Sequence, residues 1–188
     1  MDSYTISLIF IIIFLLIISA FFSGSETALT AASRSRMHQL EKEKNARAKI
    51  VNFLKNQKER LIGTLLLGNN LVNTLATAIA TSFFISFIGD NEKGIIYSTI
   101  TMTLLILIFG EVLPKTIAIN KADKFALLFA PLIKFLVRIF SPITYLIQIF
   151  INNLLKIFGF HISDELYKTE EKLRGAIDLH AKSEGTKH

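Results

Sequence analysis

The chain of 188 residues contains no cysteine and no tryptophan, and it has only three prolines. Without cysteine there is no disulfide framework and no thiolate metal site, so a bound metal must be held by oxygen atoms or by histidine. The four histidines all lie outside the long apolar runs, and these runs contain no pair of aspartates. The usual nucleophile and base combinations of an intramembrane protease are therefore missing, and we expect no enzyme.

What the chain has in abundance is apolar surface. Hydrophobic residues make up 51% of the sequence, 16 of them phenylalanine, which is too apolar for an ordinary soluble domain of this length. The net charge of +6 would suggest nucleic acid as a partner in a soluble protein. Here the basic residues flank hydrophobic runs, so we expect contact with the headgroups of a lipid bilayer and no nucleic acid.

Three stretches, at about 6–32, 61–88 and 95–119, approach the ~20 residues that a helix needs to cross the hydrocarbon core. The N-terminus lacks the positive charges of a signal peptide, so the first stretch is expected to be a retained span. Nine basic residues lie between the first two stretches, whereas the loop at 89–94 has one lysine and two acids. The positive-inside rule then predicts a plasma or inner membrane protein with its N-terminus outside and its C-terminus in the cytoplasm.

The remaining segments predict an all-α membrane protein with a belt of amphipathic juxtamembrane helices, at about 34–58 and 121–160. The second of these is apolar but interrupted by Pro131 and Pro142, and Lys134 and Arg138 share one helical face, which suits a helix in the headgroup layer. A fourth span at 139–155 is the alternative. We place one domain at 1–160 and a charged cytoplasmic helical tail at 161–188, which ends without a cap, as a piece of a longer protein would.

A single carboxylate, Glu111, lies in the third apolar stretch, three residues before Pro114. Proline has no N–H and its ring displaces the carbonyl four residues back, so Pro114 is expected to free the carbonyl of Gly110. Ionisable groups at membrane depth usually mark an ion or substrate pathway, and hard cations such as Mg²⁺ prefer oxygen ligands of this kind. The alternative is a simple ion pair between Glu111 and Lys115, one helical turn later.

The first span ends with a second polar stripe, in which Ser23, Glu26, Thr27 and Thr30 share one face. Packing is the competing explanation for each hydroxyl, because serine and threonine often bond a carbonyl of their own helix or a neighbouring helix.

In the second span, a third stripe must face protein or water rather than lipid: Asn70, Asn73, Thr74, Thr77 and Thr81. For Thr77 and Thr81 we favour interhelical hydrogen bonds. For Asn69 and Asn70, ligation of a hard cation and hydrogen bonding are about equally favoured.

Three segments in these stripes resemble the signature motifs of the CNNM/CorC family of Mg²⁺ transporters. They are FSGSETAL at 22–29, GNNLVN at 68–73 and FGEVLPKT at 109–116, and they occur in the same order on three separate spans. The resemblance implies a homodimer that exports Mg²⁺, driven by Na⁺ entry. It also implies paired cytoplasmic CBS modules that bind ATP, which this chain does not contain.

The resemblance further implies a cation site made of side-chain oxygens and main-chain carbonyls. Carried over to this chain, the metal ligands are Ser23, Ser25, Asn70, Gly110 and Glu111, and the supporting residues are Glu26, Thr27, Asn69, Asn73 and Pro114. Ser23 and Ser25 are roughly 200° apart on an ideal helix, so both serve only if the helix is distorted or one of them uses its backbone. A membrane-anchored Mg²⁺ sensor or regulatory scaffold is the alternative function.

Overall fold

The structure is a computed structural model that describes residues 3–158, and within this range the chain forms helices and no strand. The tail predicted at 161–188 lies outside the described residues.

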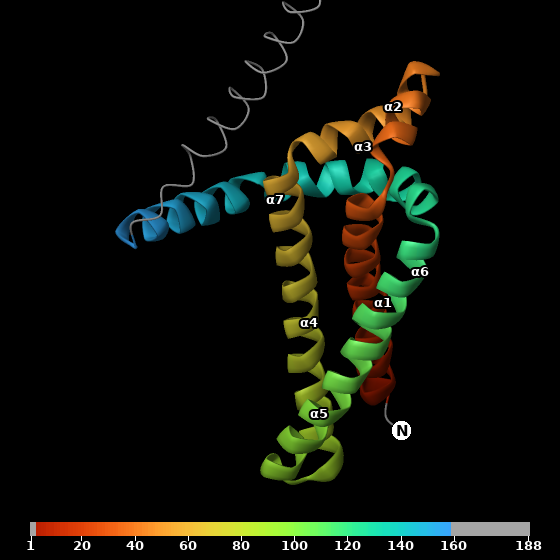
Figure 1. Ribbon diagram of the computed structural model, residues 1–188. Helices are drawn as coiled ribbons and strands as arrows, with labels where there is room; N and C mark the ends of the chain where they lie inside the picture. Colours follow the sequence, from red (N-terminus) through yellow and green to blue (C-terminus); the bar gives the residue numbers. More distant parts are fainter. Residues whose placement is uncertain (1–2, 159–188) are drawn as a thin grey trace, which may run out of the picture. The chain divides into compact units, whose positions relative to one another are not determined.

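Three long helical rods form the body of the domain (Figure 1). They are α1 (Ser3–Ala31), α4 (Lys58–Ile88) and a composite rod made of α5 (Asn91–Leu105), η1 (Ile106–Val112) and α6 (Leu113–Asn120). Each is long and apolar enough to cross a membrane. The three apolar helices expected from the sequence are therefore present, with ends a few residues from the predicted ones.

A tight turn joins α4 to α5. Gly89 ends α4 in the left-handed conformation, with φ of 73°, which favours glycine. The Asp90 side chain then caps α5 by accepting a hydrogen bond from the Lys93 N–H at 3.1 Å. Because Gly94 lies directly against the backbone of Ile85, the two helices leave the turn in close contact.

The basic segment between α1 and α4 forms two short helices, α2 (Arg34–Lys42) and α3 (Ala46–Asn56). Ser33 and Asn45 cap them, each accepting a hydrogen bond from a backbone N–H in the first turn. The helices expected at about 34–58 are thus observed as a capped pair, and their place beside the membrane stays a prediction.

The last element, α7 (Ala122–Ile157), is one continuous helix with Pro131 and Pro142 in its interior. An interruption at these prolines was expected from the sequence, and this was wrong. A proline removes one N–H, but its φ is compatible with a helix, so the helix continues where packing stabilises it. By length and composition α7 is a fourth candidate span, over Ala122–Leu155.

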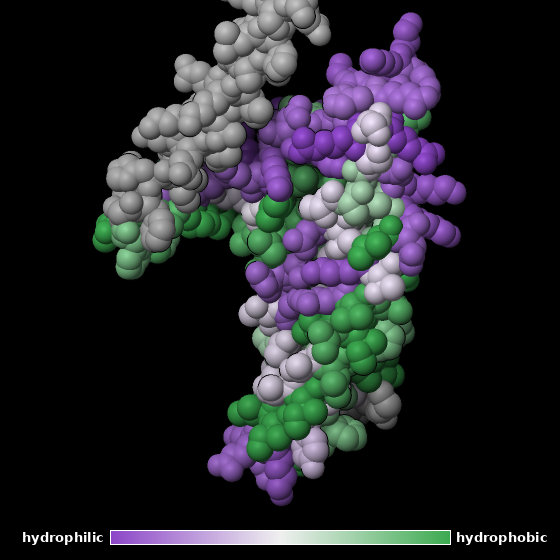
Figure 2. Space-filling view, in the orientation of Figure 1, coloured by the Kyte–Doolittle hydropathy of each residue, from purple (hydrophilic) through white to green (hydrophobic). Residues whose placement is uncertain are grey.

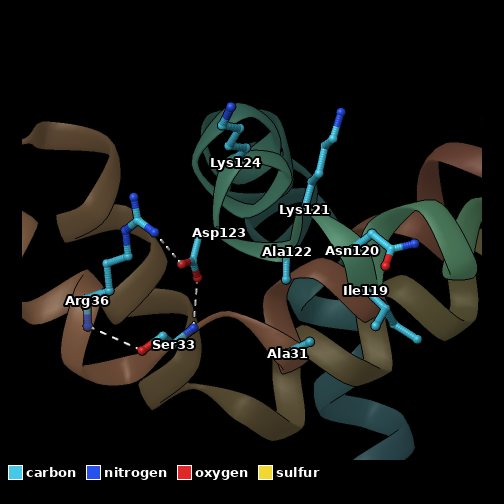
Figure 3. A pocket seen from close by; sticks show the side chains of 9 residues that line it. All are labelled: Ala31, Ser33, Arg36, Ile119, Asn120, Lys121, Ala122, Asp123 and Lys124. Carbon is cyan, nitrogen blue, oxygen red and sulfur yellow. Dashed lines mark hydrogen bonds and ion pairs between the residues drawn. The ribbon is translucent and has the colours of Figure 1, made fainter.

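The structure divides at Thr144 into two compact units, and the part of α7 in the first unit packs across the ends of α1 and α4. Near its start, the Asp123 carboxylate accepts a hydrogen bond from the Ser33 N–H at 2.9 Å and pairs with Arg36 at 3.5 Å (Figure 3). Lys121 and Lys124 point away from this contact in the same view. About 32 Å farther along the helix, Thr144 lies next to Gly63, near the start of α4. Both contacts are at the same end of the bundle.

Two faces of this part of α7 are apolar. One is buried against α1, α3 and α4 and carries, at helical spacing, Ala126, Ala130, Ile133 and Val137. The other is exposed and carries Leu128, Leu132, Phe135 and Ile139. Lys134 and Arg138 lie between these faces, and Lys134 sits 5.4 Å from the centre of the Phe53 ring. Such a helix has one face for protein, one for an apolar medium and one for water.

Candidate cation site

The first two motifs meet at a close contact between α1 and α4. A Cβ added to Gly68 would lie only 2.4 Å from the buried ring of Phe22, so only glycine allows this spacing. Phe22 begins the first motif and Gly68 begins the second. The contact therefore sets the two motifs at the same level of the bundle.

Ser19, which is fully buried, connects all three rods at this level. Its hydroxyl donates a hydrogen bond to Asn69 Oδ1 at 3.0 Å. On the other side, a Cβ added to Gly110 would lie 2.8 Å from Ser19 Oγ. Ser19 was not predicted as a site residue, although it precedes Ser23 by one helical turn and lies on the same face.

The third motif lies on a wide helical turn. Residues Ile106–Val112 form a π-helix, and the Leu113 N–H donates to the Ile108 carbonyl five residues back. Wide turns of this type occur frequently at functional sites. In this register the missing N–H of Pro114 faces the carbonyl of Phe109, one residue before the predicted Gly110.

Glu111 lies on this wide turn and is half-buried. It lines a cavity of about 300 Å³ together with hydroxyls of α4 and α5, among them Thr77, Thr99 and Thr103. Lys115 does not pair with Glu111. It pairs instead with Glu26 of α1 at 3.8 Å, so the proposed Glu111–Lys115 ion pair is absent from the described residues.

Four buried oxygens in residues 3–158 have no hydrogen-bond partner: Ser23 Oγ, Ser25 Oγ, Thr64 Oγ1 and Asn73 Oδ1. Buried polar atoms are nearly always hydrogen-bonded, so a group of orphaned oxygens calls for a ligand, an ion or a strain that explains it. Three of the four, Ser23, Ser25 and Asn73, lie within the motif segments. Hydroxyl and amide oxygens are suitable neutral ligands for a hard cation.

The predicted ligands fall in different environments. Ser23 and Ser25 are both fully buried, yet they lie on different faces of α1, which is helical throughout. Asn70 is exposed, and it is Asn69 that faces α1. Glu26 and Thr27 are half-buried, and Pro114 lies against Gly24, 3.6 Å from the position of an added Cβ. Among the described residues no three acidic or histidine side chains gather as a metal cluster, so Glu111 would act with neutral oxygens.

Thr77 and Thr81 of the second span were both expected to bond a neighbouring helix, and they differ in the structure. Thr81 makes the predicted interhelical bond, to Ser98 of α5 at 2.9 Å. Thr77 donates to the Asn73 carbonyl of its own helix and lines the cavity beside Glu111. Hydrophilic side chains gather part-way along α4, between the apolar lower part of the bundle and its hydrophilic upper end (Figure 2).

Comparison with known proteins decides the family. Residues 10–188 match the family described as Cyclin M transmembrane N-terminal domain, abbreviated CNNM. The chain belongs to the CNNM family. This confirms the resemblance carried by the three motifs, and it places the chain in a broad family of membrane transporter domains.

Individual CNNM relatives cover most of this chain. A UPF0053 protein of Haemophilus influenzae is 35% identical over 94% of the chain, and the chain spans 42% of that relative. The UPF0053 inner membrane protein YfjD of Escherichia coli is 38% identical over 76% of the chain and 33% of its own length. A putative DUF21 domain-containing chloroplastic protein of Arabidopsis thaliana is 31% identical over 85% of the chain. The chain therefore spans less than half the length of these curated relatives.

Proposed function

We propose that this domain exports Mg²⁺ from the cytoplasm, driven by Na⁺ entry, through a site between α1, α4 and η1. The observation that carries the proposal is the pair of buried serine hydroxyls without partners, Ser23 Oγ and Ser25 Oγ. They lie in the first motif, at the level where Ser19 contacts both Asn69 and Gly110. The CNNM family membership supports the transport of an ion.

The chemistry of the donors suits transport better than storage. Mg²⁺ demands about six oxygens in near-octahedral geometry and gives up its water reluctantly. One carboxylate, Glu111, neutralises part of the ion's charge, while hydroxyls, amides and carbonyls replace part of its hydration shell. A site with a single anion binds weakly enough to release its ion on the other side of the membrane.

The proposed ligands divide between the interior and the cavity. Ser23 and Ser25 contribute from the interior of the bundle, and Gly110 contributes its carbonyl from the wide turn. Glu111 faces the cavity beside Thr77. Asn70 is exposed on α4, so it contacts the ion from the side that is open to water.

In the membrane, we propose that α1, α4 and the composite rod span the bilayer, with the N-terminus outside. The first part of α7 then lies in the headgroup layer, because it crosses the ends of α1 and α4 and has an exposed apolar face beside a basic one. The protein assembles as a homodimer through its exposed spans. Binding of ATP, as the family resemblance implies, is a property of CBS modules and not of this domain.

The test is Mg²⁺ flux from liposomes that contain the purified protein, with an inward Na⁺ gradient and a Mg²⁺-sensitive dye. We expect Glu111→Ala to abolish flux, because the only carboxylate among the proposed ligands is lost. Glu92→Ala is the matched control: it removes an exposed acid from the first turn of α5, and flux should be unchanged. Normal flux in Glu111→Ala at equal protein abundance would remove the ligand assignment, and Mg²⁺ binding without flux in the wild type would favour the sensor instead.

A further inference from the structure

A second cavity lies at the cytoplasmic end of the bundle as we orient it, and Leu29, the last residue of the first motif, is its one contact with the motifs among the lining residues. It has a volume of about 130 Å³ and is formed where α1 ends, α2 and α4 begin, and α3 ends. Its polar lining is dominated by three cations from three different helices: Arg34, Lys55 and Lys58. Its apolar lining comes from the two spans themselves, through Leu29, Leu61 and Ile62.

These cations are not neutralised by direct contact with an acid of the described residues. The acid that acts on Lys55 electrostatically is Asp123, and this carboxylate is already bonded to Arg36 and to the Ser33 N–H. Lys55 is held in place because its ammonium group donates to the Ala32 carbonyl at the end of α1. The cavity therefore keeps an excess of positive charge in a fixed arrangement.

The electrostatics of Lys55 agree with this excess. Burial lowers the pKa of Lys55, the charge of Arg34 lowers it further, and Asp123 opposes the shift only in part. A bound anion would relieve both the repulsion between the two cations and the missing solvation of the ammonium group.

We propose that this cavity binds the phosphate group of an anionic phospholipid, held by Arg34, Lys55 and Lys58. Arg34 and Lys58 are exposed, so the headgroup reaches them from outside the bundle. Ile62 and, one helical turn later, the exposed Leu66 begin an apolar path along α4 that acyl chains follow into the hydrocarbon. This apolar lining favours a lipid over free phosphate, whose oxygens would need polar partners on all sides. The site is independent of Mg²⁺ transport.

Native mass spectrometry of the detergent-solubilised protein, titrated with phosphatidylglycerol or phosphatidylcholine, tests the proposal. We expect phosphatidylglycerol to bind more tightly than phosphatidylcholine, whose choline group the cations repel. The double variant Arg34→Gln/Lys58→Gln should bind phosphatidylglycerol at least about tenfold more weakly. The charge-conserving variant Arg34→Lys/Lys58→Arg should bind it within a few fold of wild type, which separates loss of charge from loss of fold.

The matched control is Lys42→Gln/Lys49→Gln, which removes the same charge from exposed positions of α2 and α3 outside the cavity. It should keep the preference for phosphatidylglycerol. An equal loss in both double variants would mean a diffuse surface attraction and overturn the site. Displacement of the lipid by inorganic phosphate at equal concentration would overturn the lipid as its occupant.

Discussion

The contact between Gly68 and Phe22 predicts a large effect from a very small change, Gly68→Ala. The added Cβ would lie 2.4 Å from the Phe22 ring, so the ring or the helix must move by about 1 Å to reach an ordinary carbon contact. Phe22 is buried and packs edge-on against Phe21, which in turn packs on Phe129 of α7. The ring therefore has no free direction in which to move.

Overpacking of this kind costs about 1–3 kcal/mol, and the better helix propensity of alanine returns about 0.5–1 kcal/mol. We expect a net loss of about 1–2 kcal/mol in the free energy of unfolding. For a chain of this size that corresponds to a fall of about 2–8 °C in Tm. Thermal unfolding in detergent, followed by circular dichroism, measures it.

Gly63→Ala is the matched control, because it makes the same substitution in the same helix. Its added Cβ would lie 3.5 Å from Thr144, an ordinary contact, so Tm should stay the same or rise slightly. In a Phe22→Leu background the cost of Gly68→Ala should fall, since the smaller side chain leaves room. The reasoning is refuted if Gly68→Ala melts like Gly63→Ala, or if its cost is the same in both backgrounds.

Two further predictions concern polar contacts between the rods. Ser19→Ala should lower the free energy of unfolding by about 1–3 kcal/mol, because Asn69 Oδ1 loses its buried donor. As a control, Ser82→Ala should change the free energy of unfolding by less than about 0.5 kcal/mol, because the Ser82 hydroxyl bonds only its own helix. Equal effects of the two substitutions in the same melting assay would contradict this prediction. Lys115→Gln should cost less than about 1 kcal/mol, because the Lys115 and Glu26 side chains are 44% and 27% exposed and water screens their pair; a larger cost would show that the pair is shielded from solvent.

The rods themselves were predictable because length and apolarity are written directly in the sequence. The ends of α4, expected near 61 and 88, are observed at Lys58 and Ile88. Helix α7 was harder, since proline and basic residues indicate an interruption, whereas packing of Ala126, Ala130 and Ile133 against the bundle keeps it helical. Its partners lie far away in sequence, and no local pattern reports them.

The polar stripe that begins at Asn70 was expected to face protein or water. In the structure Thr81 bonds Ser98 of α5, Thr77 lines the cavity and Asn70 is exposed, while the side chain that bonds α1 is Asn69. The small residues Gly68, Ala76 and Ala80 share the buried face of α4 and permit close approach, so they mark where a neighbouring helix packs. Polar residues alone do not say which neighbour they meet.

The wide turn at Ile106–Val112 has the geometry of an α-helix into which one extra residue has been inserted. If the same residues were wound as an ordinary α-helix, without the wide turn, everything after it would be rotated by about 100° around the rod axis. Pro114 would then turn away from Gly24, and Lys115 from Glu26. One extra residue in the wide turn thus sets the rotation of α6 about the rod axis. The number of residues in this rod therefore matters as much as their identity.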